Sequence, residues 1–446
     1  MSSSTRLTTA FETALIAGGF VVLFALLPHA LFSTDDQTRF DDIEQLLQHG
    51  HLTGSHFSLV MPLASAPFLL LGKVLGSPEW WAARFNVIVV AVGTLVVFRL
   101  VRGRADLSLV RIAVLVLCFA SFLTSALRGY GAETFSATMV AVGIVALVTG
   151  RRVGGWAAMV IGVVNTPPAL IGLSLIAGAE LLRTKRLRCL APLVAAAALI
   201  MLESWVRRGG PLVTGYHGDH GVKTILPYSG RPGFSYPLLF GIASILFSFG
   251  RGLLFYMPGL LLWFGVETRR LVQSCRSTIV SMLLFVAGLV LVYAKWWAWY
   301  GGFSWGPRFF TVAAIPASLL IAVRLQRPSA SIRSAGITVV VLAASAWVSI
   351  AGAVADLNWF ATFCNQNDYS LESICWYTPE FSGVGRPLVQ FPGLTVSTAV
   401  VVGYCALVFA YLAARPCITL VRASTSLRPA LARTRPVSRS RASRRP

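Results

Sequence analysis

The residues best suited to chemistry lie in a short acidic segment, residues 33–57, between two long apolar stretches. Asp35 and Asp36 stand there with other acids and a single arginine, Arg39, although the chain has a formal net charge of +21. Because a carboxylate in hydrocarbon costs roughly 2.5–3.5 kcal/mol on insertion-based scales, these acids must lie in water or in a protein-lined cavity. One aspartate can then act as a general base toward a hydroxyl group. The simpler interpretation is a solvated loop with a salt bridge to Arg39.

A second candidate site is the aromatic segment at residues 293–310, YAKWWAWYGGFSWGPRFF. A belt of interfacial rings explains its tryptophans and tyrosines, but it does not require Lys295, Arg308 or the glycines beside them. Arg308 precedes an apolar stretch, where an unpaired guanidinium is costly, and its planar fork matches a lipid phosphate. The aromatic residues offer faces for a sugar or for isoprene units. The candidates for that contact are Trp297, Tyr300 and Trp305.

Two further places contain polar residues, and each has two interpretations. Glu133 stands at the start of an apolar run, where its charge can favour a helix N-terminus or face the cavity that holds the aspartates. Residues 205–221, WVRRGGPLVTGYHGDHG, form a glycine-rich turn whose histidines and aspartate can contact a sugar, or a divalent metal as an alternative. The candidate substrate contacts in or near these segments are His56, Glu133, Tyr216 and His217.

The composition predicts a membrane protein that crosses the bilayer many times. Of 446 residues, 56% are hydrophobic and 12% are charged, about half the charged share of a soluble domain. The apolar runs are long enough, or nearly so, to cross a hydrocarbon core of about 30 Å as helices. We therefore expect an all-α integral membrane protein with about twelve transmembrane helices. The expected spans are residues 1–31, 81–100, 109–127, 134–149, 155–166, 167–182, 187–205, 253–267, 278–295, 309–325, 334–354 and 395–414.

The basic residues follow a topological pattern rather than one typical of nucleic-acid binding. Arginines cluster between alternate apolar runs, and the chain from Arg415 onward contains nine arginines and no acid. Loops rich in arginine stay in the cytoplasm, so we expect both termini there. The acids other than Glu12, Asp106, Glu180 and Glu267 then fall on or near the outer side. Two charge patterns thus indicate one topology.

We expect one transmembrane catalytic domain, residues 1–414, with three segments on the outer side. These are a first outer loop at 33–80 and two later outer segments at 206–252 and 355–394. Residues 58–76 are apolar, but no basic cluster follows them. They are therefore expected to form an interfacial helix on the outer side.

The last outer segment and the C-terminus carry two further expectations. Cys364 and Cys375 can close a small disulfide loop on an oxidising outer face, or they can stay reduced. Residues 415–446 are rich in arginine, serine, proline and alanine. That composition predicts a disordered cytoplasmic tail near an anionic inner leaflet.

The acidic segment resembles that of the GT-C superfamily, the glycosyltransferases that use lipid carriers. Residues 36–40, Asp-Gln-Thr-Arg-Phe, are similar to the Asp-Glu-Thr-Arg-Tyr signature of the bacterial lipid A aminoarabinose transferases. In that fold the first outer loop bears the catalytic aspartate. Gln37 departs from the signature, so the resemblance favours Asp36 as the matching acid and leaves the choice between Asp35 and Asp36 open.

Two more parts of the chain resemble a branch of polyprenyl-phosphate-sugar transferases common in actinobacteria. They are residues 209–216 with 247–258, GGPLVTGY and FSFGRGLLFYMP, and residues 295–310, KWWAWYGGFSWGPRFF. The similarity extends from the first helix to about Ala322. It implies a GT-C-type bundle in a bacterial plasma membrane, with the active site on the extracytoplasmic face.

The resemblance also implies a mechanism. A polyprenyl-phosphate sugar places its phosphate near Arg308, with Lys295 or Arg251 beside it. Asp36 takes the proton of an envelope glycan or glycolipid hydroxyl as this attacks the anomeric carbon, and the lipid phosphate leaves with inversion. No nucleotide or other cofactor is required, and no nucleic acid takes part. A divalent metal remains an alternative.

Other functions remain open on the sequence alone. Among enzymes, a protein O-mannosyltransferase would use the same residues with a polypeptide acceptor. A lipid or sugar transporter, or flippase, would place its charges in mid-helix, whereas nearly all charges here fall at one face. A non-catalytic assembly subunit is a third possibility. A pentose such as arabinose and a hexose such as mannose would need the same residue types.

Overall fold

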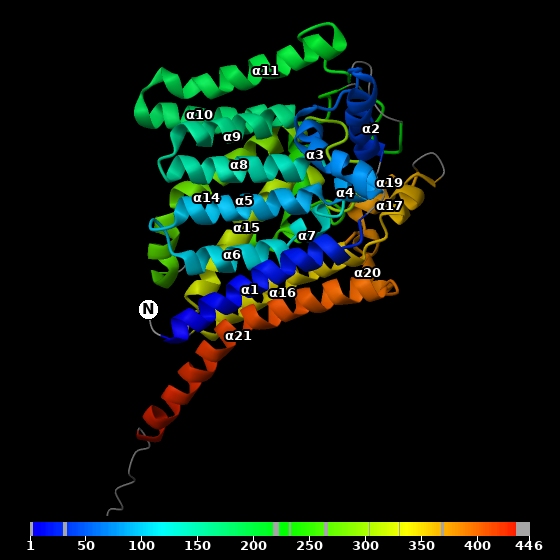
Figure 1. Cartoon of the computed structure of the whole chain (residues 1–446). Helices are drawn as coiled ribbons and strands as arrows, with labels where there is room; N and C mark the ends of the chain where they lie inside the picture. Colours follow the sequence, from blue (N-terminus) through cyan, green and yellow to red (C-terminus); the bar gives the residue numbers. More distant parts are fainter. Residues whose placement is uncertain are drawn as a thin grey trace, which may run out of the picture.

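The structure is a computed structural model, and every regular element in the part of the chain that it describes is a helix. It describes residues 3–29, 34–216, 223–231, 233–262, 266–302, 304–329, 331–366 and 370–433. The long helices run side by side (Figure 1). They are α1 (Ser3–Leu26), α5 (Phe85–Val101), α6 (Leu107–Phe119), α8 (Ala132–Val148), α9 (Arg152–Asn165), α10 (Leu170–Thr184), α11 (Ala191–Arg208), α14 (Val266–Tyr293), α15 (Ala314–Gln326), α16 (Ile332–Val354) and α21 (Val396–Arg433). The predicted all-α fold is confirmed.

The remaining elements occur mainly in the segments between these helices. The α-helical ones are α2 (Thr34–His49), α3 (Val60–Leu75), α4 (Pro78–Ala83), α7 (Leu123–Ala126), α12 (Leu238–Phe247), α13 (Leu253–Tyr256), α17 (Leu357–Cys364), α19 (Glu372–Tyr377) and α20 (Arg386–Val389). The 3-10 turns are η1 (Pro167–Ala169), η2 (Leu187–Leu190), η3 (Pro258–Leu261), η4 (Arg308–Ala313) and η5 (Pro379–Phe381).

The chain is a multi-pass membrane protein. Among the described residues, seven helices are long and apolar enough to cross a bilayer. They are Arg6–Leu26, Pro78–Val101, Leu187–Arg208, Val272–Tyr293, Arg308–Gln326, Ile332–Val354 and Val396–Val421. Shorter apolar helices accompany them, α3, α6, α8 and α12 among them. Each of these seven helices corresponds to one of the spans expected from the sequence.

One expected span, residues 253–267, is not a continuous helix. Its described part up to Leu262 contains α13 and η3, which are separated at Met257. Met257 has φ −135° and ψ 59°, outside the helical region. The reason is Pro258, which lacks an amide hydrogen and disfavours helical geometry in the residue before it.

Small residues let several helices pack closely. A side chain on Gly143 of α8 would lie 2.7 Å from the carbonyl oxygen of Gly155 on α9. Gly172 of α10 and Gly288 of α14 meet in the same way, with a Cβ of Gly288 only 2.5 Å from the Gly172 backbone. Such contacts are typical of membrane helices, where close backbone approach supplies the packing energy.

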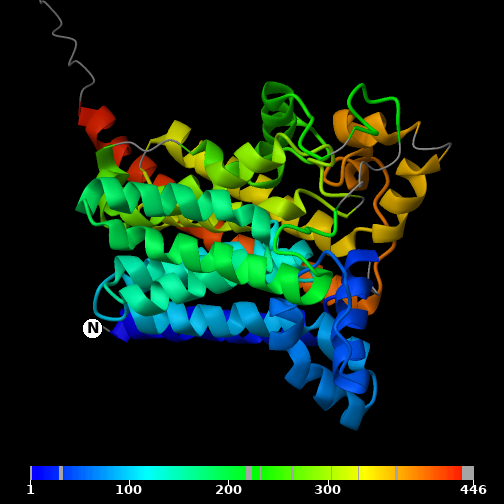
Figure 2. The ribbon, with the colours of Figure 1, turned by 90° about the horizontal axis from the view of Figure 1, so that it is seen from above.

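The segments that carry the candidate residues gather at one end of the bundle, here called the site end. Helices α2 to α4 and α17 to α20 lie there, and the N-terminus lies at the opposite end (Figure 1). The view from above places the same two groups together (Figure 2). The connections from α5 to α6, from α8 to α9 and from α10 to α11 lie at the end with the N-terminus. Those connections contain basic clusters of the sequence.

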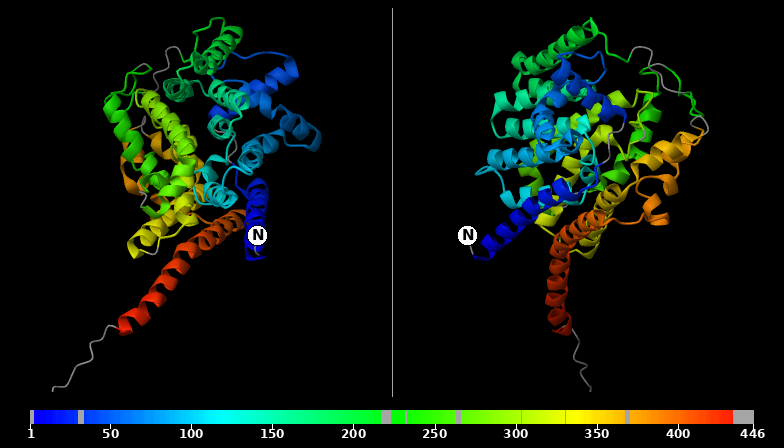
Figure 3. Two further views of the ribbon diagram at one scale, coloured as in Figure 1. Left: turned by 90° about the vertical axis from the view of Figure 1, so that its left-hand side faces the viewer. Right: turned by 45° about the vertical axis from the view of Figure 1, so that its right-hand side comes forward.

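Helix α21 extends further than expected. We placed the start of a basic tail at residue 415, but the helix continues to Arg433. Figure 3 shows this C-terminal part running away from the bundle. Residues 434–446 lie outside the described residues.

A buried carboxylate joins three helices near the end of the bundle opposite the site. Glu12 of α1 is fully buried and accepts a hydrogen bond from Arg111 of α6 at 2.6 Å. It also accepts bonds from Tyr411, at 2.9 Å, and from Arg415, both on α21. The two guanidinium groups together compensate a charge that burial would otherwise disfavour.

Glu12→Ala is therefore expected to destabilise the protein by about 3–5 kcal/mol, because it leaves the buried guanidinium of Arg111 and the partly buried one of Arg415 without their carboxylate. Thermal unfolding in detergent micelles measures the loss. Glu180→Ala is the matched control, since its partners Arg152 and Arg183 are 51% and 70% exposed and the change should have little effect. Equal unfolding temperatures for the two variants would contradict the structural role of Glu12.

Candidate active site

The two candidate segments of the sequence meet at an ion pair. Arg308 at the start of η4 donates to the Asp35 carboxylate on α2, with its Nη2 2.5 Å from Oδ2, although 273 positions separate them. The Arg308 Nε also lies 4.0 Å from a carboxylate oxygen of Glu133, at the start of α8. The side chains of Arg308 and Asp35 are 21% and 28% exposed, so both remain accessible. Arg308 thus stands between two carboxylates in an open site.

Asp36 occupies a more buried position beside this pair. Arg39 donates to its Oδ1 at 3.3 Å, and the backbone amide of Tyr130 donates to its Oδ2 at 3.1 Å. The Arg39 guanidinium is itself packed over the Phe57 ring, 4.1 Å from the ring centre. Asp36 therefore has a fixed orientation.

Burial separates the acidities of the two aspartates. It raises the pKa of Asp36 to about 6, against the opposing effect of Arg39 and with the support of the Glu133 charge. Burial also acts to raise the pKa of Asp35, but Arg308 and Arg39 outweigh it and the pKa is lowered. At neutral pH, Asp35 is an ion-pair partner, whereas Asp36 has the pKa of an effective general base.

The turn that contacts Asp36 is held by Asn86 of α5. The buried Asn86 amide donates to the carbonyl groups of Gly129 and Gly131, both at 2.9 Å. A side chain on Gly129 would lie 2.8 Å from Asp36 Oδ2, so only glycine allows this approach. The adjacent Arg128 donates to the carbonyls of Gly352 and Ala355 at the end of α16. The position of Asp36 therefore depends on three different helices.

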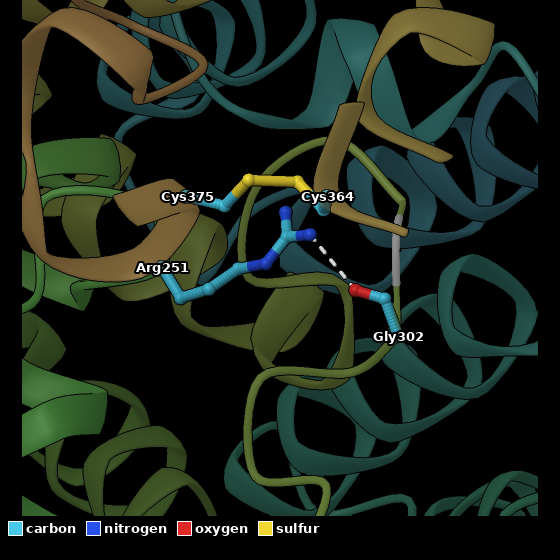
Figure 4. Close-up of a disulfide and its surroundings, with 4 residues drawn as sticks. All are labelled: Arg251, Gly302, Cys364 and Cys375. Carbon is cyan, nitrogen blue, oxygen red and sulfur yellow. Dashed lines mark hydrogen bonds between the residues drawn. A yellow bond between two sulfur atoms is a disulfide. The ribbon is translucent and has the colours of Figure 1, made fainter. Parts of the chain in front are cut away.

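Arg251 holds the loop that carries Arg308. Its buried guanidinium donates to the carbonyl group of Gly302 at 2.8 Å (Figure 4) and to that of Gly306, also at 2.8 Å. Gly306 has φ +66°, and a Cβ there would lie 2.5 Å from the Phe122 ring. Arg251 was expected to contact the lipid phosphate; the structure places it behind the loop, where it binds backbone carbonyls.

The disulfide partners lie next to Arg251. Cys364 and Cys375 are bonded to each other and fully buried, with Cα atoms 6.3 Å apart (Figure 4). Trp376, the next residue, lies with its ring 4.6 Å from the Arg251 guanidinium. The same ring stacks on Tyr300 at 4.7 Å. The disulfide segment thus packs against the loop from residue 300 to 308.

Some of the other candidate residues lie near the charged groups of the site, and the rest hold the surrounding chain in place. The His56 ring lies 4.4 Å from that of Tyr216, and burial together with the Asp35 charge raises the pKa of Tyr216 to about 12. Lys295 and Trp297 hold the chain at 233–236 through their backbones, at 3.0 and 3.2 Å. The Trp305 ring is stacked on Phe122, at 5.8 Å. His217 lies outside the described residues.

Another aspartate of the acidic segment, Asp42, has a structural role. Arg207, at the end of α11, donates to Asp42 at 3.2 Å and to Glu203 at 3.0 Å. Its Nε donates to the carbonyl of Thr53 at 3.0 Å. Since Asp42 and Arg207 are buried, these bonds fix the connection between α2 and α3 against α11.

Sequence reasoning missed Asn86, the Tyr130 amide and Arg128. Asn86 is an amide inside an apolar run, a pattern that marks a functional position in a membrane helix and was available in the sequence. The Tyr130 amide is a backbone group, so no residue type reveals it. Arg128 precedes Tyr130 in a turn between two apolar runs, and its carbonyl partners, Pro28, Gly352 and Ala355, are 100 or more positions away.

The site combines a base with cationic groups for an anion. Within the described residues, no three His, Cys, Asp or Glu side chains come together in a way that can hold a metal ion. The three carboxylates at the site face Arg39 and Arg308 instead. This arrangement can remove a proton beside a bound anionic group.

Comparisons with known proteins place the fold. A scan against family models and a search of curated proteins give no match. The chain is similar to the crystal structure of ArnT from Cupriavidus metallidurans in the apo state, with 15% identity, a TM-score of 0.53 and coverage of 97% of this chain and 82% of that one. The structure of that protein bound to undecaprenyl phosphate gives 15% identity, a TM-score of 0.52 and coverage of 96% and 82%. The chain has a GT-C fold.

The arabinosyltransferase EmbB from Mycobacterium smegmatis is a further match, with 17% identity, a TM-score of 0.46 and coverage of 95% of this chain and 42% of that one. The fold is the one that the resemblance of residues 36–40 implied. At these identities the likeness establishes the fold. The chemistry of this GT-C protein therefore rests on its own residues.

Asn86→Ala is expected to lower the free energy of unfolding by about 1–3 kcal/mol, because it removes the donor that two partly buried carbonyls share. It should also reduce activity, since the turn that contacts Asp36 loses its support. Thermal unfolding and the rate of sugar transfer measure the two effects. Gln45→Ala, at an exposed position of α2, is the control and should change neither. An unchanged unfolding temperature in Asn86→Ala would contradict the role assigned to the amide.

Proposed function

We propose that the protein is a membrane glycosyltransferase that moves a sugar from a polyprenyl-phosphate carrier to a hydroxyl group of an envelope glycan or glycolipid. The observation that carries the proposal is the contact of Arg308 with Asp35 at 2.5 Å. It brings the residue suited to the carrier phosphate next to the aspartates suited to the acceptor. One substrate can therefore reach both groups.

Asp36 is the proposed general base. As the acceptor oxygen attacks the anomeric carbon, its proton passes to the Asp36 carboxylate. The pKa of about 6 that burial gives this carboxyl keeps it mostly ionised at neutral pH, yet more basic than an ordinary aspartate. The Tyr130 amide and Arg39 orient the carboxylate.

Arg308 is the proposed partner of the leaving group. The bond between the anomeric carbon and the phosphate oxygen breaks, and its electron pair leaves with the polyprenyl phosphate. The phosphate thereby gains one negative charge, which a nearby guanidinium stabilises. Attack from one side and departure on the other invert the anomeric centre. Asp35 and Glu133 keep Arg308 in place during this step.

The proposed carrier agrees with the fold. ArnT from Cupriavidus metallidurans, which shares the GT-C fold, has been crystallised with undecaprenyl phosphate. We extend a carrier of that chemical class to this chain because Arg308 offers a fork for its phosphate.

We also propose that the site end is extracytoplasmic, in a bacterial plasma membrane, and that both termini are cytoplasmic. The support is the distribution of charge. Basic clusters lie in the connections at the end with the N-terminus, and the acidic segment lies at the site end. Positive loops are retained in the cytoplasm.

Asp36→Asn is expected to lower kcat/KM for sugar transfer by about 10²–10⁴-fold, the usual contribution of a general base. Binding of polyprenyl phosphate should be kept, since the variant removes a charge that burial disfavours. In the wild type, activity should fall as the pH drops through about 6, because protonation removes the base. A radiolabelled-sugar transfer assay across pH 4.5–8 tests both points. Full activity in Asp36→Asn would exclude this residue as the base.

Arg308→Ala is expected to weaken binding of polyprenyl phosphate about tenfold to a hundredfold, since hydrogen bonds to charged groups contribute about 1.5–3 kcal/mol. Calorimetry or a lipid-binding assay in nanodiscs measures the affinity. Arg231→Ala, an exposed arginine packed near Tyr228, is the matched control and should bind as the wild type does. If both variants keep the wild-type affinity, Arg308 does not bind the phosphate.

A further inference from the structure

A separate cavity lies at the site end, lined mostly by residues 355–393, which none of the sequence motifs covers, and by Trp305 of the aromatic segment. Its volume is about 250 Å³, and we call it the Trp305 cavity. The residues that matter for its chemistry are Trp305, Asp356, Arg386, Gln390, Phe391 and Gly393. Pockets for drug-sized ligands have about 300–1,000 Å³, so this cavity suits one small ring rather than a lipid.

The wall of the cavity is held by hydrogen bonds to the bundle. The Trp305 indole donates to the carbonyl of Gly383 at 3.3 Å, and the Trp347 indole of α16 donates to that of Val384 at 2.8 Å. Within the wall, the backbone N–H of Gln390 donates to the carbonyl of Arg386 at 2.8 Å. The cavity is therefore preformed.

The lining combines balanced charge with an aromatic face. Asp356 and Arg386 contribute one charge of each sign, and the exposed Gln390 side chain adds both a donor and an acceptor. Arg386 packs over the Trp359 ring at 3.7 Å, which fixes its plane. Phe391 is 47% exposed and offers a ring for stacking. A neutral ring with many hydroxyl groups can bond to both charged side chains and to Gln390 and can stack on Phe391. A phosphate would instead be repelled by the Asp356 carboxylate.

Two walls of the cavity continue directly into the active site. Trp305 belongs to the loop that ends at Arg308. The carbonyl of Ala355, another lining residue, accepts from Arg128 at 2.8 Å. Gly129, which follows Arg128 in the chain, approaches Asp36 closely. A sugar in the cavity is thus next to the segments that hold both the base and the phosphate partner.

We propose that the Trp305 cavity is a subsite for one neutral sugar residue of the acceptor glycan. The inference rests on the proposed function, because it assigns the acceptor of that reaction to a saccharide. It also places the recognition of this acceptor in the outer segment at 355–394. The specificity for the acceptor then comes from residues that take no part in the chemical step.

A bulky side chain at Gly393 tests the subsite. Gly393 lines the cavity and a Cβ at this position meets no atom within 4 Å, so Gly393→Trp is chosen to occupy the cavity and Gly393→Ala is the matched control. The probes are the methyl glycosides of arabinose, xylose and mannose, observed by saturation-transfer NMR on the full chain in nanodiscs. At least one glycoside should bind the wild type and Gly393→Ala equally. Its affinity should be at least tenfold weaker for Gly393→Trp.

Two further variants separate the possible outcomes. Binding of the same glycoside should persist in Arg308→Ala, because the subsite lies outside the phosphate site. Gln390→Ala should weaken it several-fold and provides a second test if Gly393→Trp fails to fold, as judged by its thermal unfolding in detergent micelles. Unchanged glycoside binding in Gly393→Trp and Gln390→Ala, loss of binding in Arg308→Ala, or no binding to the wild type would each overturn the proposal. None of these results depends on the affinity for polyprenyl phosphate, which tests the proposed function separately.

Discussion

The rest of the site depends on the ion pair between Arg308 and Asp35. A guanidinium at the mouth of an apolar bundle is tolerated only if carboxylates or an anionic ligand compensate it. Asp35 comes from α2 and Glu133 from α8, so this arrangement requires α2, the start of α8 and the loop before η4 to meet. These segments are far apart in the chain. Their contact therefore defines the relative position of the base and the phosphate partner.

Backbone carbonyl groups hold both halves of this arrangement. Asn86 binds two carbonyls of the turn that contacts Asp36, and Arg251 binds two carbonyls of the loop that carries Arg308. Because the Asn86 and Arg251 side chains are themselves buried, each support is costly to lose. The polar residues of the bundle interior thus serve to position turns, whereas the charged residues at the site end remain accessible to substrate.

The sequence predicted the elements that depend on local pattern. The apolar runs indicated the membrane helices, and the residue types of the acidic and aromatic segments indicated a common site, since acids and a phosphate-binding arginine are needed together. The broken span at 253–267 was missed because a single proline outweighed the apolar pattern around it. Asp42 was indistinguishable from its neighbours until the structure paired it with Arg207. Arg251 was assigned by residue type to a phosphate, and its carbonyl partners could not be inferred from any spacing.

The disulfide between Cys364 and Cys375 has a consequence for biogenesis. Trp376, which follows the second cysteine, packs on both Arg251 and Tyr300. These contacts hold the loop that carries Arg308 in place. With the proposed topology, that covalent link forms only after the segment has been translocated and met an oxidant. Until the two thiols are oxidised, the loop that carries Arg308 would therefore lack this covalently closed support.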